Sequence, residues 1–442
     1  MIRRSTMFAT VVVSVLAIAA ALAPPHCEAE GSLRLIQPKF VETGHAPPKT
    51  LTPPARAAWK ESMDVAVLAG ALALASFLAL RKRSRKGMIA LSLFSIAYFG
   101  FYRKGCVCPV GSVQNMVSAW TDPLYLLPWT IVAFFTLPLA FALFFGRTFC
   151  GAVCPLGTLQ EMFVIRPLRL PLWLERPLRL GPYLVLGLAI VVTASGGGYM
   201  ICRYDPFVGF FRLGGPFVIL VFGGVLLILG TVVGRPYCRF LCPYSVLLNA
   251  CSRLSWRHVG VTPDTCVKCR LCEGACPYDC ILFPTPARPP ETRAAGVRRL
   301  AGSLLLLPVL VAGGVWLGAR LAGPLSSASR TVRLADQVAR EDAGLAPAST
   351  IDSQTFRVSR QSVPDLAGEA RAIRASFRRN SSVLGGFLGL AFGANLVGLA
   401  VRRRREDYVP DRGHCVSCAR CFRYCPKEHE RLKKLAKRGT AA

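Results

Sequence analysis

Long apolar blocks alternate with short basic stretches along most of the chain. After a first run near residues 7–23, apolar runs follow near 64–80, 87–102, 124–145, 182–200, 215–233, 301–322 and 383–401. A helix needs about 20 residues to cross a bilayer, and several of these runs come close to that length. The pattern predicts an all-α fold, a polytopic transmembrane helix bundle, in which the short 87–102 run is the weakest candidate span.

The N-terminus has the pattern of an export signal. Arg3 and Arg4 precede the apolar run, and Ala21-Leu22-Ala23 is typical of a cleavage site, although Pro24 disfavours cleavage there. Residues 1–23 are therefore interpreted as a signal peptide or an N-terminal anchor. The Pro-rich residues 24–61 are expected to be exported and irregular.

The basic residues predict the orientation of the bundle. Residues 81–86 carry five positive charges, which place this loop in the cytoplasm of a bacterium. Counting spans from there puts 234–300 and 402–442 in the cytoplasm and 323–382 outside, as in a multi-pass inner-membrane protein. The expected units are a transmembrane core at 62–260, a metal-binding motif at 261–290, a helix at 299–322, an exported insert at 323–382, a helix at 383–401, and a second motif with a basic tail at 402–442.

The insert at 323–382 has mixed charges, few aromatic residues and no cysteine. We expect a small helical element that docks a partner, and a poorly structured loop is the alternative.

Composition adds one constraint on partners. The net charge is +30 although 52% of the residues are hydrophobic. A soluble chain this basic would suggest nucleic-acid binding, but here the charge lies between apolar blocks, so no nucleic-acid partner is expected. Membrane lipid is the expected partner, and the basic residues 427–438 suit anionic headgroups. A simply solvated tail is the alternative.

Cysteine is abundant and histidine is scarce. The 18 cysteines lie mostly in tight clusters typical of metal ligands. None of the five histidines lies in an apolar run and no C-x-x-C-H sequence occurs. Neither a transmembrane haem nor a covalent c-type haem is therefore expected.

Two segments, run 1 (266–276) and run 2 (415–425), have the C-x2-C-x2-C-x3-C-P spacing of bacterial ferredoxins. In such runs three thiolates bind one 4Fe-4S cluster, and the cysteine ahead of proline binds the partner cluster. The predicted ligands of the first cluster are Cys266, Cys269, Cys272 and Cys425, and those of the second are Cys415, Cys418, Cys421 and Cys276. We expect these clusters in a small cytoplasmic two-cluster ferredoxin-like module.

This assignment requires the tail to fold back onto run 1 across about 140 residues and two spans. If the tail does not reach, each run binds its own cluster. A pair of zinc sites is the remaining alternative, and zinc sites rarely show this spacing. Cys280 is expected to be a buried thiol with no ligand role.

A second constellation repeats along the chain. Gly146-Arg-Thr-Phe-Cys-Gly-Ala-Val-Cys-Pro155 matches Gly234-Arg-Pro-Tyr-Cys-Arg-Phe-Leu-Cys-Pro243, which predicts an internal duplication. The two cysteines of each C-x3-C-P pair share a helix face. The two faces predict a further Fe–S cluster at Cys150, Cys154, Cys238 and Cys242, with Arg147 and Arg235 offsetting its charge. Two structural turns with free thiols are the alternative.

Three more cysteines, Cys106, Cys108 and Cys202, lie on the predicted outer side. They form either an outer centre, with Asp205 or Cys27 as last ligand, or a disulfide, which an oxidising compartment permits. The argument for a centre is distance, because a hydrocarbon core about 30 Å thick is too wide for one fast electron hop.

The two C-x3-C-P sequences, together with Phe101-Tyr-Arg-Lys-Gly-Cys-Val-Cys-Pro-Val-Gly-Ser-Val-Gln-Asn115, resemble the polyferredoxin half of the NosR/NirI and NapH family. The resemblance covers roughly 62–280 and the last 30 residues. It implies a protein that passes electrons between the quinol pool and exported reductases. The exported segment is too short for an FMN-binding domain, so no covalent FMN is expected, and a separate exported flavoprotein, cytochrome or reductase would take its place.

The leading hypothesis is a transmembrane electron-transfer protein, as in quinol dehydrogenase components, that links the quinol pool or a cytoplasmic donor to an exported partner. No residue is assigned a catalytic role, and no His–carboxylate pair at a span end indicates a quinone site. A metal-reducing maturation factor of the CcoG type is the second hypothesis, disfavoured because that family carries a C-terminal immunoglobulin-like domain. An iron–sulfur redox sensor is the third.

Overall fold

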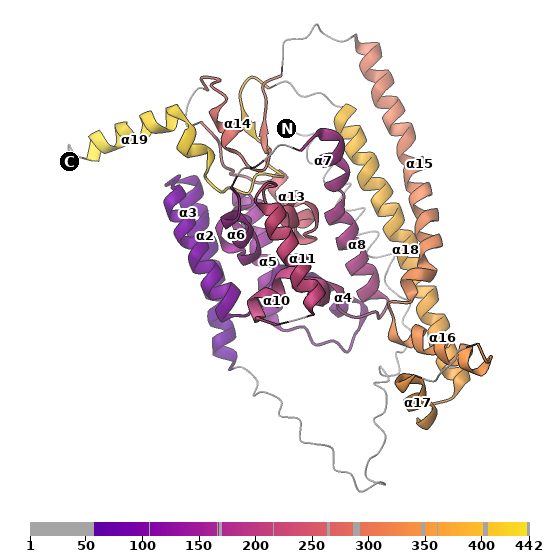
Figure 1. The fold of residues 1–442 in the computed structure, drawn as a ribbon. Coiled ribbons are helices and arrows are strands. Elements are labelled where there is room, and N and C mark those ends of the chain that lie inside the picture. The colour runs from indigo at the N-terminus through magenta and orange to yellow at the C-terminus, as the bar shows by residue number, and fades with distance from the viewer. Residues whose placement is uncertain are drawn as a thin grey trace.

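The computed structural model describes residues 57–105, 107–165, 167, 170–214, 216–262, 266–285, 292–345, 350–359, 361–400 and 405–439. The predicted signal segment, Cys27 and Cys106 lie outside these residues. The described chain is mostly helical, as the apolar pattern predicts (Figure 1). The segment expected to be irregular up to residue 61 already becomes helical at Ala58. No proline lies between Pro54 and Pro109 to interrupt this helix, and Glu61 in its first turn suits the positive end of the helix dipole.

The core is a set of long and short helices. Its elements are α2 (Ala58–Leu80), α3 (Arg85–Ser95), the π-helix η2 (Ile96–Tyr102), α4 (Pro109–Thr121), α5 (Trp129–Phe145), the π-helix η3 (Phe149–Val153), α6 (Pro155–Met162), α7 (Leu172–Leu178), α8 (Gly181–Ala194), α9 (Met200–Tyr204), α10 (Pro206–Arg212), α11 (Phe217–Gly230), α12 (Pro236–Phe240) and α13 (Tyr244–Arg253).

Proline determines where several of the short helices begin. Helices α4, α6 and α10 each have proline as their first residue. Proline lacks an N–H, and its fixed φ suits the first helical turn, so it starts a new helix rather than continuing the previous one. The residues before these prolines occupy the helix N-caps and are Cys108, Cys154 and Asp205.

Four described helices are long and apolar enough to cross a membrane, at 59–80, 173–194, 293–326 and 363–398. A fifth candidate is the pair α10 and α11, which is bent by 105°. The runs at 87–102 and 124–145 give shorter helices. The first is an 11-residue helix that continues into a π-helix, and the second is the 17-residue α5, which starts after Pro128.

A long helical hairpin separates the two ferredoxin runs. It consists of α15 (Arg293–Ser326) and α18 (Val363–Ala400), which lie side by side in Figure 1. Glycine allows their close approach, because a Cβ on Gly314 would lie 2.1 Å from the carbonyl oxygen of Gly385. Between them lie α16 (Arg330–Asp342) and α17 (Ile351–Val358), so the insert is helical where it is described.

The two runs meet at the opposite end of the molecule from α16 and α17 (Figure 1). This region contains α14 (Leu271–Ala275), the 3-10 helix η4 (Cys421–Tyr424) and α19 (Pro426–Gly439). Strand β1 (Ile281–Leu282) pairs antiparallel with β2 (Val409–Pro410). An apolar-run analysis does not detect this pair, since two-residue strands that join segments far apart in the chain leave no local pattern.

Candidate metal centres

The first pocket lies beside α14 and combines cysteines from both runs. Its lining includes the first three cysteines of run 1 and the last cysteine of run 2. We call it pocket 1, and its cysteines are Cys266, Cys269, Cys272 and Cys425.

The second pocket has the reciprocal composition. It contains the first three cysteines of run 2 and the last cysteine of run 1. We call it pocket 2, and its cysteines are Cys276, Cys415, Cys418 and Cys421. The structure therefore brings together the residues of each predicted ligand set, and the tail does reach run 1.

Backbone contacts hold the two runs in this exchanged arrangement. Besides the β1–β2 pair, the amide of Asp411 donates to the carbonyl of Cys280 at 2.7 Å. The Cys280 thiol is buried and points to the carbonyl oxygens of Tyr278 at 3.3 Å and His414 at 3.2 Å. Cys280 thus joins the two runs by hydrogen bonds, in addition to lining pocket 2.

The two runs also share one backbone conformation. Lys268 and Arg270 in run 1 have φ of 54° and 65°, and Ser417 and Ala419 at the same positions of run 2 have φ of 56° and 62°. Left-handed residues at these points curl each loop around its own cysteines. The amide of Lys268 accordingly donates to the Cys266 sulfur at 3.4 Å.

The two pockets carry the donor set of a 4Fe-4S cluster. Each is lined by three thiols of one run and by the fourth cysteine of the other run. This division of ligands is the one found in two-cluster bacterial ferredoxins.

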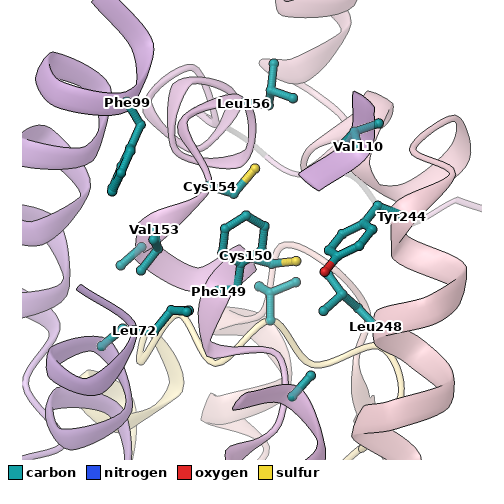
Figure 2. Packing of buried hydrophobic residues seen from close by; sticks show 14 of the residues in the cluster. Leu72, Phe99, Val110, Phe149, Cys150, Val153, Cys154, Leu156, Tyr244 and Leu248 are labelled. Carbon is teal, nitrogen blue, oxygen red and sulfur yellow. The ribbon is translucent and has the colours of Figure 1, made fainter. Parts of the chain in front are cut away.

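The C-x3-C-P cysteines form a third group inside the core. Cys150 and Cys154 point into the core among Phe149, Val153 and Tyr244 (Figure 2). Burial raises the pKa of the Cys154 thiol, and the charges of Cys238, Cys150 and Cys242 raise it further. A Cβ on Gly157 would lie 3.3 Å from the Cys150 carbonyl oxygen and 3.7 Å from the Cys238 sulfur, so the two C-x3-C-P pairs face one another. Four buried thiolates repel one another, so the sulfurs of such a group are stable either as protonated thiols or as ligands of a positively charged metal centre.

Polar side chains complete this third group. Gln160 donates to the Cys238 sulfur at 3.3 Å and accepts from the Tyr237 amide at 3.1 Å. Arg147 lies 3.7 Å from the Cys150 sulfur and donates to the Gly413 carbonyl at 3.1 Å. Arg147 therefore contacts the third group directly, as the sequence suggests, and also the segment that leads into run 2.

Arg235 acts differently from Arg147. Its guanidinium is 1% exposed and pairs with Glu161 at 2.9 Å rather than with a sulfur. Arg235 also donates to the carbonyl oxygen of Cys150, and its partner Glu161 pairs with Arg420, which lines pocket 2. Arg235 therefore lies between the third group and pocket 2.

Glu161 is a functional candidate that the sequence analysis does not identify. Its buried carboxylate pairs with Arg235, with Arg85 at 2.9 Å and with Arg420 at 2.7 Å. Burial alone would raise the pKa of Glu161, but Arg235, Arg420 and Arg85 hold it below the usual carboxyl value. Three segments of the chain are therefore held together by one ionised carboxylate.

Two glycines of the repeated sequences allow the runs to reach the core. A Cβ on Gly151 would lie 2.6 Å from the carbonyl oxygen of Val416 in run 2. A Cβ on Gly234 would lie 2.3 Å from the carbonyl oxygen of Pro277, just after run 1. Only glycine permits this approach of backbone to backbone.

Of the three outer cysteines, Cys108 and Cys202 lie within the described residues. A Cβ on Gly111 would lie 3.0 Å from the Cys202 sulfur, so Cys202 packs against the helix that begins after Cys108. Asp205 caps α10 by accepting from the Phe207 and Val208 amides, and it accepts from the Tyr237 hydroxyl at 2.8 Å. Asp205 thus accepts hydrogen bonds from three protein donors, and its role as a last ligand of an outer centre stays a prediction.

Comparison with known proteins supports the metal-binding interpretation of the core. Three segments, 88–124, 127–172 and 215–262, match the 4Fe-4S binding domain family Fer4_5. They include Cys108 and both C-x3-C-P pairs and exclude the two ferredoxin runs.

Two curated proteins illustrate the range of similarity. Uncharacterized protein MJ0750 of Methanocaldococcus jannaschii is 30% identical over 201 residues, which cover 43% of this chain and 80% of the archaeal protein. A protein of Escherichia coli K12 described as "Putative electron transport protein YccM" is 33% identical over 118 residues, 24% of this chain and 33% of YccM. The match thus spans one third of YccM. No solved structure matches the chain.

Proposed function

Because the chain belongs to the same family as the archaeal protein MJ0750 and matches a 4Fe-4S binding domain in three segments, we propose that it is a membrane-bound iron–sulfur electron-transfer protein. The observation that carries the proposal is the presence of three four-cysteine groups in one chain, two of them with exchanged ligands. A bound 4Fe-4S cluster supplies a one-electron donor and acceptor.

The protein's own residues would serve three purposes. The thiols of pocket 1, pocket 2 and the third group would hold the clusters. Arg147, Arg235 and their neighbours would offset the negative charge that thiolate ligands bring into a buried site. Apolar side chains such as Phe149 and Tyr244 would exclude water from the third group.

The placement of Arg235 supports a route through the molecule. It donates to the carbonyl oxygen of Cys150 in the third group, and its partner Glu161 pairs with Arg420 in the lining of pocket 2, so these two sites are neighbours. We propose that electrons pass along pocket 1, pocket 2 and the third group, between a cytoplasmic donor or the quinol pool and an exported flavoprotein, cytochrome or reductase. The NosR/NapH resemblance supports the choice of partners, and the four candidate membrane helices support the location.

The test is anaerobic purification with iron counting and an EPR redox titration. Two cubanes give about eight iron atoms, and a third cluster adds about two to four. Replacing Cys238 and Cys242 by Ser should remove only that additional iron, while Cys251→Ser on α13 serves as the matched control. A wild-type protein with about eight iron atoms and no third signal would exclude the route.

Transfer itself is measurable in proteoliposomes that contain a trapped electron acceptor. External reductant should reduce the trapped acceptor through the wild type and through Cys251→Ser. The Cys238→Ser/Cys242→Ser protein should lose this reduction while the signals of pockets 1 and 2 persist. Equal rates for all three proteins would show that the third group takes no part in transfer.

A further inference from the structure

Helix α19 leaves the molecule sideways from the place where run 2 ends. It follows Cys425 directly and extends away from the bundle beside the end of α2 and α3 (Figure 1). Its first turn is fixed by Glu428, which is 1% exposed and pairs with Arg83 at 2.8 Å. Arg83 lies in the loop after Leu80, the last residue of a candidate membrane helix. The start of α19 is therefore held at the level where α2 would leave the bilayer.

Arg83 is itself held in place from several sides. Its guanidinium lies over the Phe422 ring at 3.9 Å and donates to the carbonyl oxygens of Gly260 and Val261 at 3.0 and 2.6 Å. The Arg83–Glu428 pair therefore has little freedom to reorient. It determines which face of α19 points toward α2.

That face continues as an apolar one. Leu432 and Leu435 follow Glu428 at i+4 and i+7, so the three residues share one side of the helix. Because Glu428 points to the loop after α2, both leucines point the same way. They are 48% and 49% exposed, which shows that the described protein covers neither of them fully.

The rest of α19 is basic. Its sequence PKEHERLKKLAKRG contains six lysines and arginines and only two glutamates, one of which is Glu428. The basic residues lie beside and opposite the leucine face, as in helices that lie in a membrane interface. Two leucines bury too little apolar surface to bind a neutral bilayer, so attraction to negative headgroups is needed.

We propose that α19 lies along the surface of a bilayer that contains anionic lipid, with Leu432 and Leu435 toward the acyl chains and the lysines among the headgroups. The proposal does not depend on electron transfer. It does give the lipid a structural role, because the docked helix holds Pro426 and therefore Cys425, the residue that run 2 contributes to pocket 1.

The experiment uses the full-length protein in nanodiscs of phosphatidylcholine and in nanodiscs with one part phosphatidylglycerol to three parts phosphatidylcholine. Amide hydrogen exchange of 427–439 is expected to slow at least about tenfold in the anionic discs. Salt near 1 M, where the Debye length is about 3 Å, should remove most of the difference.

Matched variants separate lipid binding from other causes. Lys433→Gln/Lys434→Gln/Lys437→Gln should abolish the difference, whereas Arg330→Gln/Arg333→Gln/Arg340→Gln on α16 should preserve it. Unchanged exchange in α18 would show that all proteins are folded. Equal exchange of α19 in the two kinds of nanodisc overturns the proposal. If exchange is equal in both nanodiscs and slows only when an acidic protein is added, α19 binds a protein rather than lipid, and the proposal is overturned as well.

Discussion

Pocket 1 and pocket 2 are built from the same cysteine spacing and the same left-handed backbone positions, yet their surroundings differ. Val267 of run 1 is 52% exposed, whereas Val416 at the equivalent position of run 2 is 8% exposed. Arg270 is likewise exposed, and its equivalent Ala419 is buried. Run 2 packs on the helical core and run 1 faces solvent. A ligand motif therefore specifies the donors of a site, and the packing around it decides how well the site is protected.

The largest expected effect tests whether the pockets really exchange ligands. Cys425→Ser should remove about four iron atoms and the same EPR signal that Cys269→Ser removes, although Cys425 belongs to run 2. The control is Cys280→Ser, which should retain both signals. If Cys425→Ser instead removes the EPR signal that depends on Cys418, each run binds its own cluster and the pockets do not exchange ligands.

A second prediction concerns the carboxylate that joins run 2 to the core. Glu161→Gln leaves the buried Arg235 without its anionic partner and should cost about 3–5 kcal/mol of stability, measured by denaturant unfolding in detergent. The matched control is Glu430→Gln, whose exposed side chain pairs with Lys427 at the surface.

Acid should also destabilise the wild-type protein, because protonation removes the negative charge of Glu161. The arginines lower the pKa of Glu161 in the folded protein, so its contribution is complete above the ordinary carboxyl pKa and is lost as the pH falls through the lowered value. Stability of Glu161→Gln should therefore depend less on pH in that acidic range. An equal loss in wild type and variant would contradict the role given to this carboxylate.

A smaller effect is expected where glycine lets each run approach the core. Gly151→Ala would place a methyl group against Val416, and Gly234→Ala would place one against Pro277. Each should cost about 1–3 kcal/mol, with Gly151→Ala weakening pocket 2 and Gly234→Ala weakening the neighbourhood of run 1. Gly70→Ala is the control, because nothing lies within 4 Å of its added Cβ. The amount of iron that each of the three variants retains during mild urea treatment would rank them. Equal retention in all three would show that the close approaches of Gly151 and Gly234 do not stabilise the pockets.

The smallest expected difference is one of rate. Under limiting oxygen the EPR signal of pocket 1 should decay several-fold faster than that of pocket 2, because Cys269 is exposed and run 2 is covered by the core. Assigning each signal by its Cys→Ser variant makes the measurement specific. Equal decay would show that exposure of the loop does not limit cluster loss.

The sequence predicts much of this arrangement for clear reasons. Apolar runs have a local signature, so α2 and α15 contain the runs expected at 64–80 and 301–322. Helix α18 contains most of the run expected at 383–401 but begins at Val363, inside the segment expected as the insert, because the polar residues 363–382 give no apolar run to mark its start. Cysteine spacing is equally local, so the members of each pocket can be named. Glu161, Gly151 and Gly234 were not identified, because their partners Arg420, Val416 and Pro277 are distant in the chain and a single contact leaves no periodic pattern. The direction of α19 depends in the same way on one pair, Arg83 and Glu428.

The hairpin of α15 and α18 has a consequence for biosynthesis. Neither pocket has a complete set of cysteines until the ribosome has passed Cys425, near the end of the chain, since run 1 alone contributes three residues to one pocket and one to the other. Both long helices must be made before then. Neither four-cysteine set can therefore be complete before both long helices have been synthesised, and a chain terminated early within α18 would hold only part of each set.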